Sequence, residues 1–347
     1  MQFGINNTPF EEAEFRARVA NTKARMAAQG LDVLLVTDPA NMNYLTGYDG
    51  WSFYVHQVVI VALNEEQPLW IGRRQDVNGA RLTTVLPDER IIGYSDDYVQ
   101  STVKHPMQFV ADQLKARGLA RGTIGVEADA YYFTGKALDV LRAELSEASI
   151  EDAGVLVNWV RVVKSEREIH YMRQAARIVE HAMQAAVDSM GHGMRQCDVV
   201  AAIQHAQISG TPEYAGDYPA IVPLLPSGVG TSCPHVTWRD EPFVNDTGTI
   251  IEIAGVCHRY HCPLSRTVYL GKPPQKMLHA EQVVIEGIAA ALEAAKPGAL
   301  ARDVHAAWNT VIERNGIFKE SRCGYSTGLG FPPDWGEHTI SLRSSDQ

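Results

Sequence analysis

Residues 186–202 read AVDSMGHGMRQCDVVAA, and residues 291–307 repeat the pattern as ALEAAKPGALARDVHAA. The alignment places Asp198 opposite Asp303. Both copies read as the end of one helix, a glycine-containing turn and the start of another helix. Because only two copies occur, the repeat is not that of a solenoid. It predicts a domain built from two related helical halves with internal pseudo-symmetry.

The helix that leads into the first copy has a clear start and a buried face. Ser165 and Glu168 form a capping-box pattern, in which each side chain accepts a hydrogen bond from the other residue's backbone N–H. Apolar residues then recur at spacings of three and four, which predicts a helix of about 33 Å with one face in the core. These residues are Ile169, Met172, Ala176, Val179, Met183, Ala186 and Met190. Residues 218–270 contain the strand-like runs IVPLL, TIIEIAGV and RTVYL, so this domain is expected to be mixed α+β.

The amino-terminal part of the chain alternates between helical and strand patterns. Residues 11–29 predict a helix with Phe15, Val19, Thr22 and Met26 on its apolar face, ended by Gly30. Strands are predicted at 31–37, 58–63, 69–72 and 123–127, with helices near 107–116 and 136–145. We therefore expect an α/β domain over residues 1–160 and a second domain over residues 161–347.

Composition narrows the class of protein. The 347 residues include 31 Lys and Arg against 41 Asp and Glu, a net charge of −10, which argues against a general nucleic-acid binder. Five cysteines in a chain of this length are typical of reduced thiols in a cytosol. The start lacks the pattern of a secretory signal, and no apolar run reaches 18 residues. A cytoplasmic protein without membrane contact is expected.

Two motifs suggest chemistry that their surroundings disfavour. Residues 324–328, GYSTG, match the G-x-S-x-G nucleophile pattern, which needs a strand-to-helix turn, but the following LGFPP disfavours a helix. Residues 257–262, CHRYHC, resemble a zinc cluster. If they continue the preceding strand, Cys257 and Cys262 face opposite sides and cannot converge on one metal, although a bulge or turn would change their facing.

Several titratable residues remain as site candidates. Glu252 lies within the apolar run TIIEIAG, where a buried carboxylate has to shift its pKa or find a partner. His235 follows a proline, where a structural role is as reasonable as a catalytic one. Residues 332–338, PPDWGEH, read as a loop that gathers Asp334, Trp335, Glu337 and His338, a composition typical of pockets.

The stretch VVKSEREIHYMRQAAR from Val162 resembles the opening helix of the pita-bread proteins, such as methionine aminopeptidase, prolidase and creatinase. Residues 1–160, including NMNYLTG at 41–47, resemble the amino-terminal domain of creatinase-like members. The resemblance implies an α/β domain followed by an α+β pita-bread domain with an internal pseudo-two-fold repeat.

Metallopeptidase members of that family bind two metal ions through two Asp, one His and two Glu. LSRT at 264–267 anchors the match, which puts Glu252 at the first Asp position, Pro263 at the second and Thr327 at the His position. The last two Glu would come from strands beyond Gln347. The resemblance therefore implies neither a metal nor another cofactor.

Within the family, the segments around residues 218–223, 234–243, 250–255 and 332–338 are most similar to a branch that hydrolyses ectoine, a cyclic amidine bearing a carboxylate. The implied reaction, with 5-hydroxyectoine as a further substrate, opens the ring to N-acetyl-L-2,4-diaminobutyrate. Glu252 would attack to form a covalent adduct, His235 would act as general acid and base, and Trp335 would form a wall against the amidinium. Further implied substrate contacts are Tyr218, Asp334, Glu337 and His338.

The resemblance also implies a homodimer in which aromatic residues of the partner's amino-terminal domain reach the site. Trp51, Phe53 and Tyr54 match that region, whereas Val55 replaces the arginine that creatinase uses for its substrate carboxylate. Three alternatives stay open: a creatinase-type amidinohydrolase, a metal-dependent Xaa-Pro aminopeptidase or prolidase, and a non-catalytic binding scaffold.

Overall fold

A computed structural model describes residues 8–345. The chain divides into two compact units, Met1–Val163 and Lys164–Gln347. The first unit contains a six-stranded sheet with the strand order β4-β3-β2-β1-β5-β6. Its strands are β1 (Val33–Val36), β2 (Val58–Ala62), β3 (Leu69–Arg73), β4 (Ile91–Tyr94), β5 (Gly122–Val126) and β6 (Ala148–Asp152). Its helices are α1 (Glu12–Ala28), α2 (Pro39–Thr46), α3 (Val77–Thr83), α4 (Pro106–Ala116), α5 (Gly135–Glu144) and α6 (Leu156–Val160), with short 3-10 turns between some of them.

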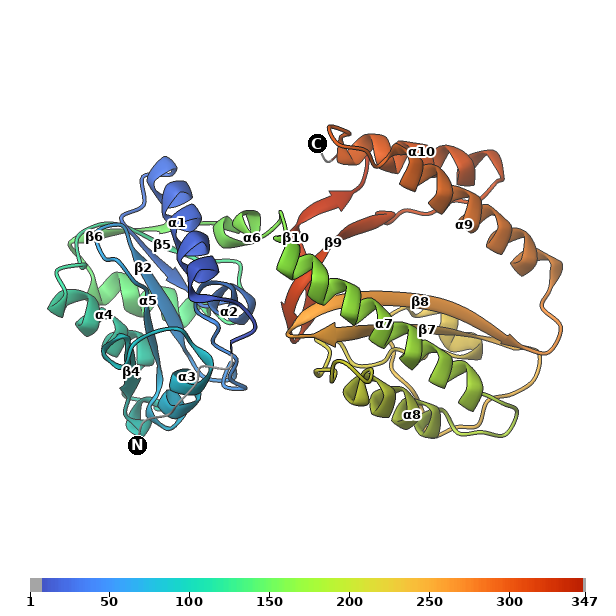
Figure 1. The fold of residues 1–347 in the computed structure, drawn as a ribbon, viewed down its shortest axis with the longest axis horizontal. Helices are drawn as coiled ribbons and strands as arrows, with labels where there is room; N and C mark the ends of the chain where they lie inside the picture. Colours follow the sequence, from blue (N-terminus) through green and yellow to red (C-terminus); the bar gives the residue numbers. More distant parts are fainter. Residues whose placement is uncertain (1–7, 346–347) are drawn as a thin grey trace. The chain divides into compact units, whose positions relative to one another are not determined.

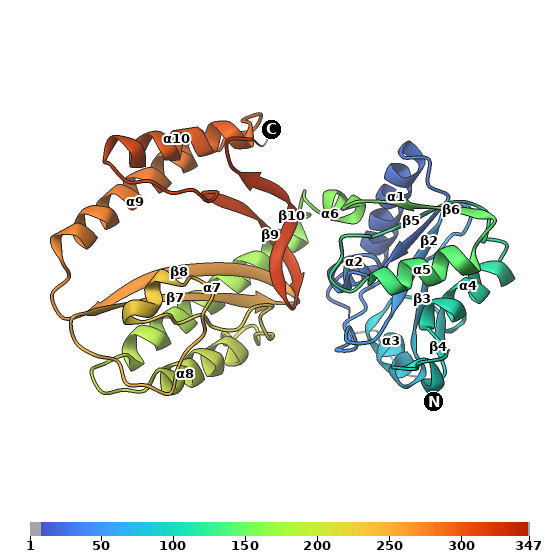
Figure 2. The ribbon, with the colours of Figure 1, turned by 180° about the vertical axis from the view of Figure 1, so that it is seen from behind.

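Helices cover both faces of this sheet, so the predicted α/β class is confirmed. Helices α4 and α5 pack on one face through residues such as Leu114 and Leu141, and α1 lies on the other (Figure 2). The predicted apolar face of α1 is confirmed, because Phe15, Val19 and Met26 are buried. The sequence patterns missed the outer strands β4 and β6, whose side chains are less buried than those of the inner strands β1 and β2.

The second unit is built from two copies of one motif, as the repeat predicts. Helices α7 (Glu166–Ser189) and α8 (Gln196–Ser209) precede the hairpin of β7 (Thr247–Cys257) and β8 (Tyr260–Leu270). Helices α9 (Gln275–Ala294) and α10 (Ala301–Arg314) precede the hairpin of β9 (Gly324–Phe331) and β10 (Asp334–Leu342). Asp198 and Asp303 occupy the same position in the first turns of α8 and α10. The internal pseudo-two-fold of the sequence is therefore present in the fold.

The two hairpins form one sheet with the order β10-β9-β8-β7. Strand β9 joins β8 where Leu329 pairs with Tyr260, and from there the hairpins diverge (Figure 1). The β7–β8 hairpin packs on α7, and Gly255 comes so close that a Cβ there would lie 2.1 Å from the carbonyl oxygen of Ala175. Glycine is thus required where the strand crosses the helix.

The start of α7 is as predicted, but its buried face is shifted. Ser165 Oγ accepts from the Glu168 N–H at 3.3 Å, and Glu168 accepts from the Ser165 N–H at 2.8 Å. The predicted stripe is correct near the end of the helix. In its first half the buried residues are instead Tyr171, Ala175 and Ile178. The β7–β8 hairpin crosses this half, and the small side chain of Ala175 fits under Gly255 better than a larger residue would.

The strand expected at residues 257–262 continues only through Cys257, the last residue of β7. His258 and Arg259 then form a two-residue turn with φ of +49° and +68°, which is the case left open for this segment. Cys257 pairs with Tyr260 across this turn, which puts Cys257 and Cys262 on the same face of the hairpin.

Residues 334–338 belong to strand β10 rather than to a loop, because the reversal is completed at Pro332–Pro333. The GYSTG motif begins β9 and is followed by this hairpin rather than by a helix, as expected. Ser326 Oγ lies 2.7 Å from Thr339 Oγ1, so the two hydroxyl groups form a hydrogen bond within the hairpin. It does not sit on a nucleophile turn.

Candidate active site

Glu252 lies in the middle of β7, on the face opposite the helices. Its neighbours Ile251 and Ile253 are buried in the core with α7 and α8, so the alternation of the strand turns Glu252 the other way. Its backbone exchanges two hydrogen bonds of 3.0 Å with Leu224, which holds the preceding segment along the strand. Burial raises the pKa of the half-buried Glu252 carboxyl, and the charge of His235 opposes this rise. The carboxyl is thus partly desolvated.

His235 lies in the exposed segment between the 3-10 turn Gly228–Ser232 and β7. Its charge acts electrostatically on the carboxyl of Glu252, which lies 17 positions further along the sequence. A hydrogen bond of 2.8 Å between Ser227 Oγ and Thr249 Oγ1 ties this segment to β7. An open cavity of about 230 Å³ adjoins it and is lined by residues on either side of His235, including Cys233 and Val236.

The β9–β10 hairpin contributes Trp335 and Tyr325 to the same face. Trp335 is 1% exposed and packs with Ala220 and Ala254. Ala254 lies two positions after Glu252 on β7, on the same face of the strand. Its indole Nε1 donates a 2.8 Å hydrogen bond to the Tyr325 hydroxyl. Sequence reasoning missed Tyr325, because it lies within the dismissed GYSTG motif and carries no titratable signal at neutral pH.

Asp334 and His338 form an ion pair at the beginning of β10. His338 Nε2 lies 2.9 Å from Asp334 Oδ2. Burial acts to raise the pKa of the Asp334 carboxyl, but hydrogen bonds from His338 and the Gly336 N–H together hold that pKa below its usual range. The pair is partly exposed, and its carboxylate also acts electrostatically on Tyr325. Asp334 therefore faces the same region as Glu252.

Glu337 is 1% exposed and is paired with Lys164 at 2.6 Å between Oε2 and Nζ. Gly328 faces this pair, and a Cβ there would lie 2.5 Å from Glu337 Oε1. The pair links the start of α7 to the β10 strand. Tyr218, another predicted contact, carries the Arg259 guanidinium at 3.6 Å over its ring. One ring face of Tyr218 is thus already covered.

The aromatic residues that are predicted to reach the partner's site in a dimer lie in the first unit of the chain. They are Trp51, Phe53 and Tyr54. Trp51 is 57% and Tyr54 61% exposed, and the ring of Phe53 lies 4.7 Å from that of Trp51. Exposed large aromatics of this kind mark contact surfaces more often than isolated apolar residues do. Trp51, Phe53 and Tyr54 remain predicted contacts of the substrate.

The donor atoms near Glu252 do not fit a pair of metal ions. Pro263, at the second Asp position, pairs with Ala254 on the adjacent strand and has no side-chain donor. Thr327, at the His position, offers only a hydroxyl group. Within residues 8–345 no group of three or more His, Cys, Asp or Glu residues is arranged to hold a metal ion.

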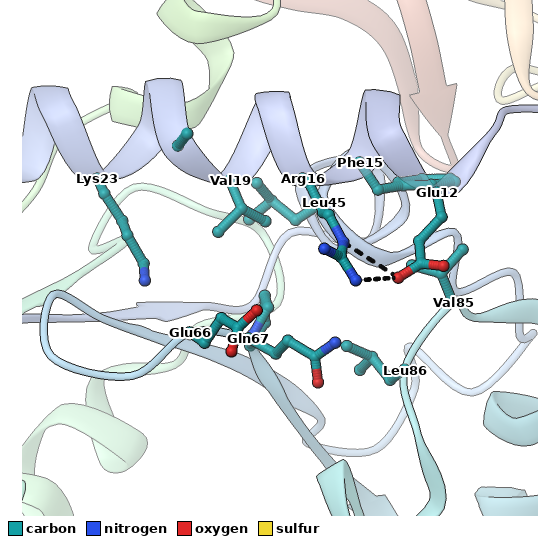
Figure 3. A pocket seen from close by; sticks show the side chains of 12 residues that line it. Glu12, Phe15, Arg16, Val19, Lys23, Leu45, Glu66, Gln67, Val85 and Leu86 are labelled. Atoms are coloured by element: carbon teal, nitrogen blue, oxygen red, sulfur yellow. Dashed lines mark hydrogen bonds and ion pairs between the residues drawn. The ribbon is translucent and has the colours of Figure 1, made fainter.

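A separate cavity of about 240 Å³ lies between α1 and the 66–68 loop (Figure 3). Phe15, Val19 and Leu45 line its apolar side, and Arg16 is paired with Glu12 at its edge. None of the predicted site residues lines it. Among the described helices, none is both long and apolar enough to cross a bilayer.

Comparison with known proteins gives the chain its relatives. Residues 18–163 match the Creatinase/Prolidase N-terminal domain, and residues 170–345 match Metallopeptidase family M24. The chain is 46% identical to the ectoine hydrolase of Halomonas elongata over 346 residues, which cover 98% of this chain and 86% of that protein. It is 45% identical to an uncharacterised hydrolase/peptidase of Sinorhizobium fredii over 337 residues, covering 97% of this chain and 86% of the relative.

Solved structures support the same fold. The prolidase from Thermococcus sibiricus superposes with a TM-score of 0.79 at 18% identity, over 96% of this chain and 85% of that one. From its two domains, its internal repeat and its relatives, the chain belongs to the creatinase/prolidase-like family of pita-bread hydrolases.

Proposed function

We propose that this protein hydrolyses ectoine, and 5-hydroxyectoine as well, by direct attack of Glu252 on the amidinium carbon. The observation that carries the proposal is the placement of Glu252 in the middle of β7, as a half-buried carboxylate whose pKa is raised by burial and on which the charge of His235 acts. The 46% identity to an ectoine hydrolase over nearly the whole chain supports the choice of substrate. The carboxylates of Glu252 and Asp334 both act electrostatically on Tyr325, and a cationic amidinium is complementary to such a negative potential.

In the proposed mechanism, an oxygen of Glu252 bonds to the amidinium carbon and gives a neutral tetrahedral adduct. His235, acting as an acid, protonates one ring nitrogen, and the bond between that nitrogen and carbon breaks to release the amine end. The remaining nitrogen forms a double bond to the carbon and passes its proton to the released amine, which leaves the carbon bound to Glu252 as an O-acyl imidate. His235 then takes a proton from water, the water oxygen bonds to the same carbon, and Glu252 leaves as a carboxylate. The product is the N-acetyl diaminobutyrate.

We propose further that the reaction needs no metal ion. Pro263 and Thr327 replace two of the family's metal ligands with residues that bind metal poorly or not at all. An amidinium carbon is already electrophilic because of its delocalised positive charge, so a carboxylate can attack it without a Lewis acid. Bond-making and proton transfer are therefore assigned to Glu252 and His235, with Trp335 forming an apolar wall.

The exposed rings of Trp51 and Tyr54, with the half-buried Phe53 between them in sequence, support the proposal of a homodimer in which one protomer's first unit approaches its partner's site. Trp51→Ala is expected to raise KM for ectoine about tenfold, because the loss of a cation–π contact of about 1–2 kcal/mol corresponds to that factor. Sedimentation at assay concentration tests the oligomeric state directly.

The decisive assay is incubation with ectoine, with and without EDTA, followed by detection of the ring-opened product. Equal turnover in both arms and loss of turnover in Glu252→Gln support the proposal. The competing metallopeptidase function predicts the opposite pattern: no ectoine turnover, and release of an amino acid from an Xaa-Pro dipeptide that EDTA abolishes.

A further inference from the structure

The hydroxyl of Tyr325 is fixed as an acceptor on one side and is left to donate on the other. An indole N–H can only donate, so the 2.8 Å contact with Trp335 Nε1 makes the phenolic oxygen the acceptor. The hydrogen of that hydroxyl must therefore point away from Trp335. Because Trp335 is buried in the cluster with Ala220 and Ala254, this orientation is held by packing.

The surroundings of Tyr325 keep it protonated, and its ring packs against the cluster of Ala220, Ala254 and Trp335 on the face of β7 that carries Glu252. Burial is the largest influence on its pKa and raises it, and the negative charges of Glu252 and Asp334 raise it further against the opposing hydrogen bond from Trp335. The Arg322 guanidinium stacks 4.2 Å from the ring centre and is itself tied to Ser341 Oγ at 2.9 Å. At neutral pH Tyr325 is therefore a neutral phenol donor on which the charge of Glu252 acts.

We propose that Tyr325 is a third catalytic residue, whose hydroxyl donates a hydrogen bond to a ring nitrogen of the cyclic amidinium as the adduct with Glu252 forms. This inference rests on the function proposed above. The proton stays on Tyr325, while His235 supplies the proton that the leaving nitrogen keeps. No bond to Tyr325 is made or broken.

The chemistry of the amidinium explains why such a donor acts on the rate rather than on binding. Both nitrogens of an amidinium share their lone pairs with the central carbon and carry hydrogens, so neither accepts a hydrogen bond in the bound substrate. When Glu252 attacks, the carbon becomes tetrahedral and each nitrogen regains a lone pair. The hydrogen bond from Tyr325 thus strengthens only on the way to the adduct, which lowers the barrier without tightening substrate binding.

The test is Tyr325→Phe, which removes the hydroxyl and keeps the ring. We expect kcat for ectoine to fall about 100-fold, as for the loss of one transition-state donor, while KM stays within about threefold. Tyr269→Phe is the matched control, because Tyr269 donates to the Asp246 carbonyl at the far end of the β7–β8 hairpin. The control should keep its kcat.

A second variant covers a failure of Tyr325→Phe to fold, which thermal melting would reveal. Trp335→Phe keeps the phenol but removes its fixed donor, so kcat should fall less, and the double variant should be no slower than Tyr325→Phe alone. A wild-type kcat in either single variant, or a change confined to KM, overturns the role of Tyr325 and leaves the proposed function standing. A wild-type protein without ectoine turnover overturns both this role and the proposed function.

Discussion

His261 should make the stability of the second unit fall steeply in mild acid. The side chain is fully buried; its Nε2 accepts from the Ala220 N–H at 2.9 Å, so its Nδ1 carries the hydrogen and donates to the Arg259 carbonyl at 2.9 Å. Burial lowers the pKa of His261 to about 4, from an ordinary value of 6.5. Only the neutral ring fits these two contacts.

The magnitude follows from that difference in pKa. Between pH 6.5 and 4 the unfolded chain binds a proton at His261 that the folded chain does not, so stability is lost as the pH falls through this window. A difference of 2.5 pKa units, from 6.5 − 4, corresponds to about 3 kcal/mol at 1.36 kcal/mol per unit. Above pH 6.5 the residue has no effect on the pH dependence.

Urea unfolding at pH 7 and pH 4.5 measures this effect in the wild type and in His261→Gln. Glutamine can accept a hydrogen bond from the Ala220 N–H and does not titrate. On acidification the variant should therefore lose about 2–3 kcal/mol less stability than the wild type. The comparison removes the contributions of other histidines, which titrate equally in both proteins. Identical losses in the two proteins would refute the neutral, buried state of His261.

Two other substitutions test the packing around the site. Glu337→Gln removes the carboxylate that pairs with the buried Lys164 ammonium and should destabilise the protein by about 3–5 kcal/mol in denaturant titrations. The double change Glu337→Leu with Lys164→Met removes both charges and should restore much of the lost stability. Gly255→Ala places a Cβ 2.1 Å from the Ala175 carbonyl oxygen. It should lower the melting temperature by about 2–4 °C for each kcal/mol of stability lost from a unit of the size of Lys164–Gln347. A variant that melts with the wild type would contradict the close approach of strand and helix.

Much of the fold could be predicted from local sequence signals. The capping box at Ser165, the apolar face of α1 and the helix–turn–helix repeat all depend on residues close in sequence, and all three are confirmed. Where prediction failed, a distant partner decided the outcome. The shift of the buried face of α7 comes from Gly255 in another element.

The candidate site shows the same division. Glu252 stood out because a carboxylate in an apolar strand is unusual, and its half-burial agrees with that signal. Tyr325 carried no such signal, because its importance arises from Trp335 on the neighbouring strand. Likewise, the turn at His258 and Arg259 required two residues with positive φ that are neither glycine nor asparagine, which no turn rule favours.

Covalent attack by Glu252 is tested most directly by mass spectrometry of protein quenched in acid during turnover of ectoine. In His235→Ala the step that removes the adduct should be slowed, so the protein is expected to gain the mass of one ectoine on the peptide that contains Glu252. Glu252→Gln should show no gain. Normal turnover of ectoine by Glu252→Gln, or an adduct on a different residue, would contradict the account.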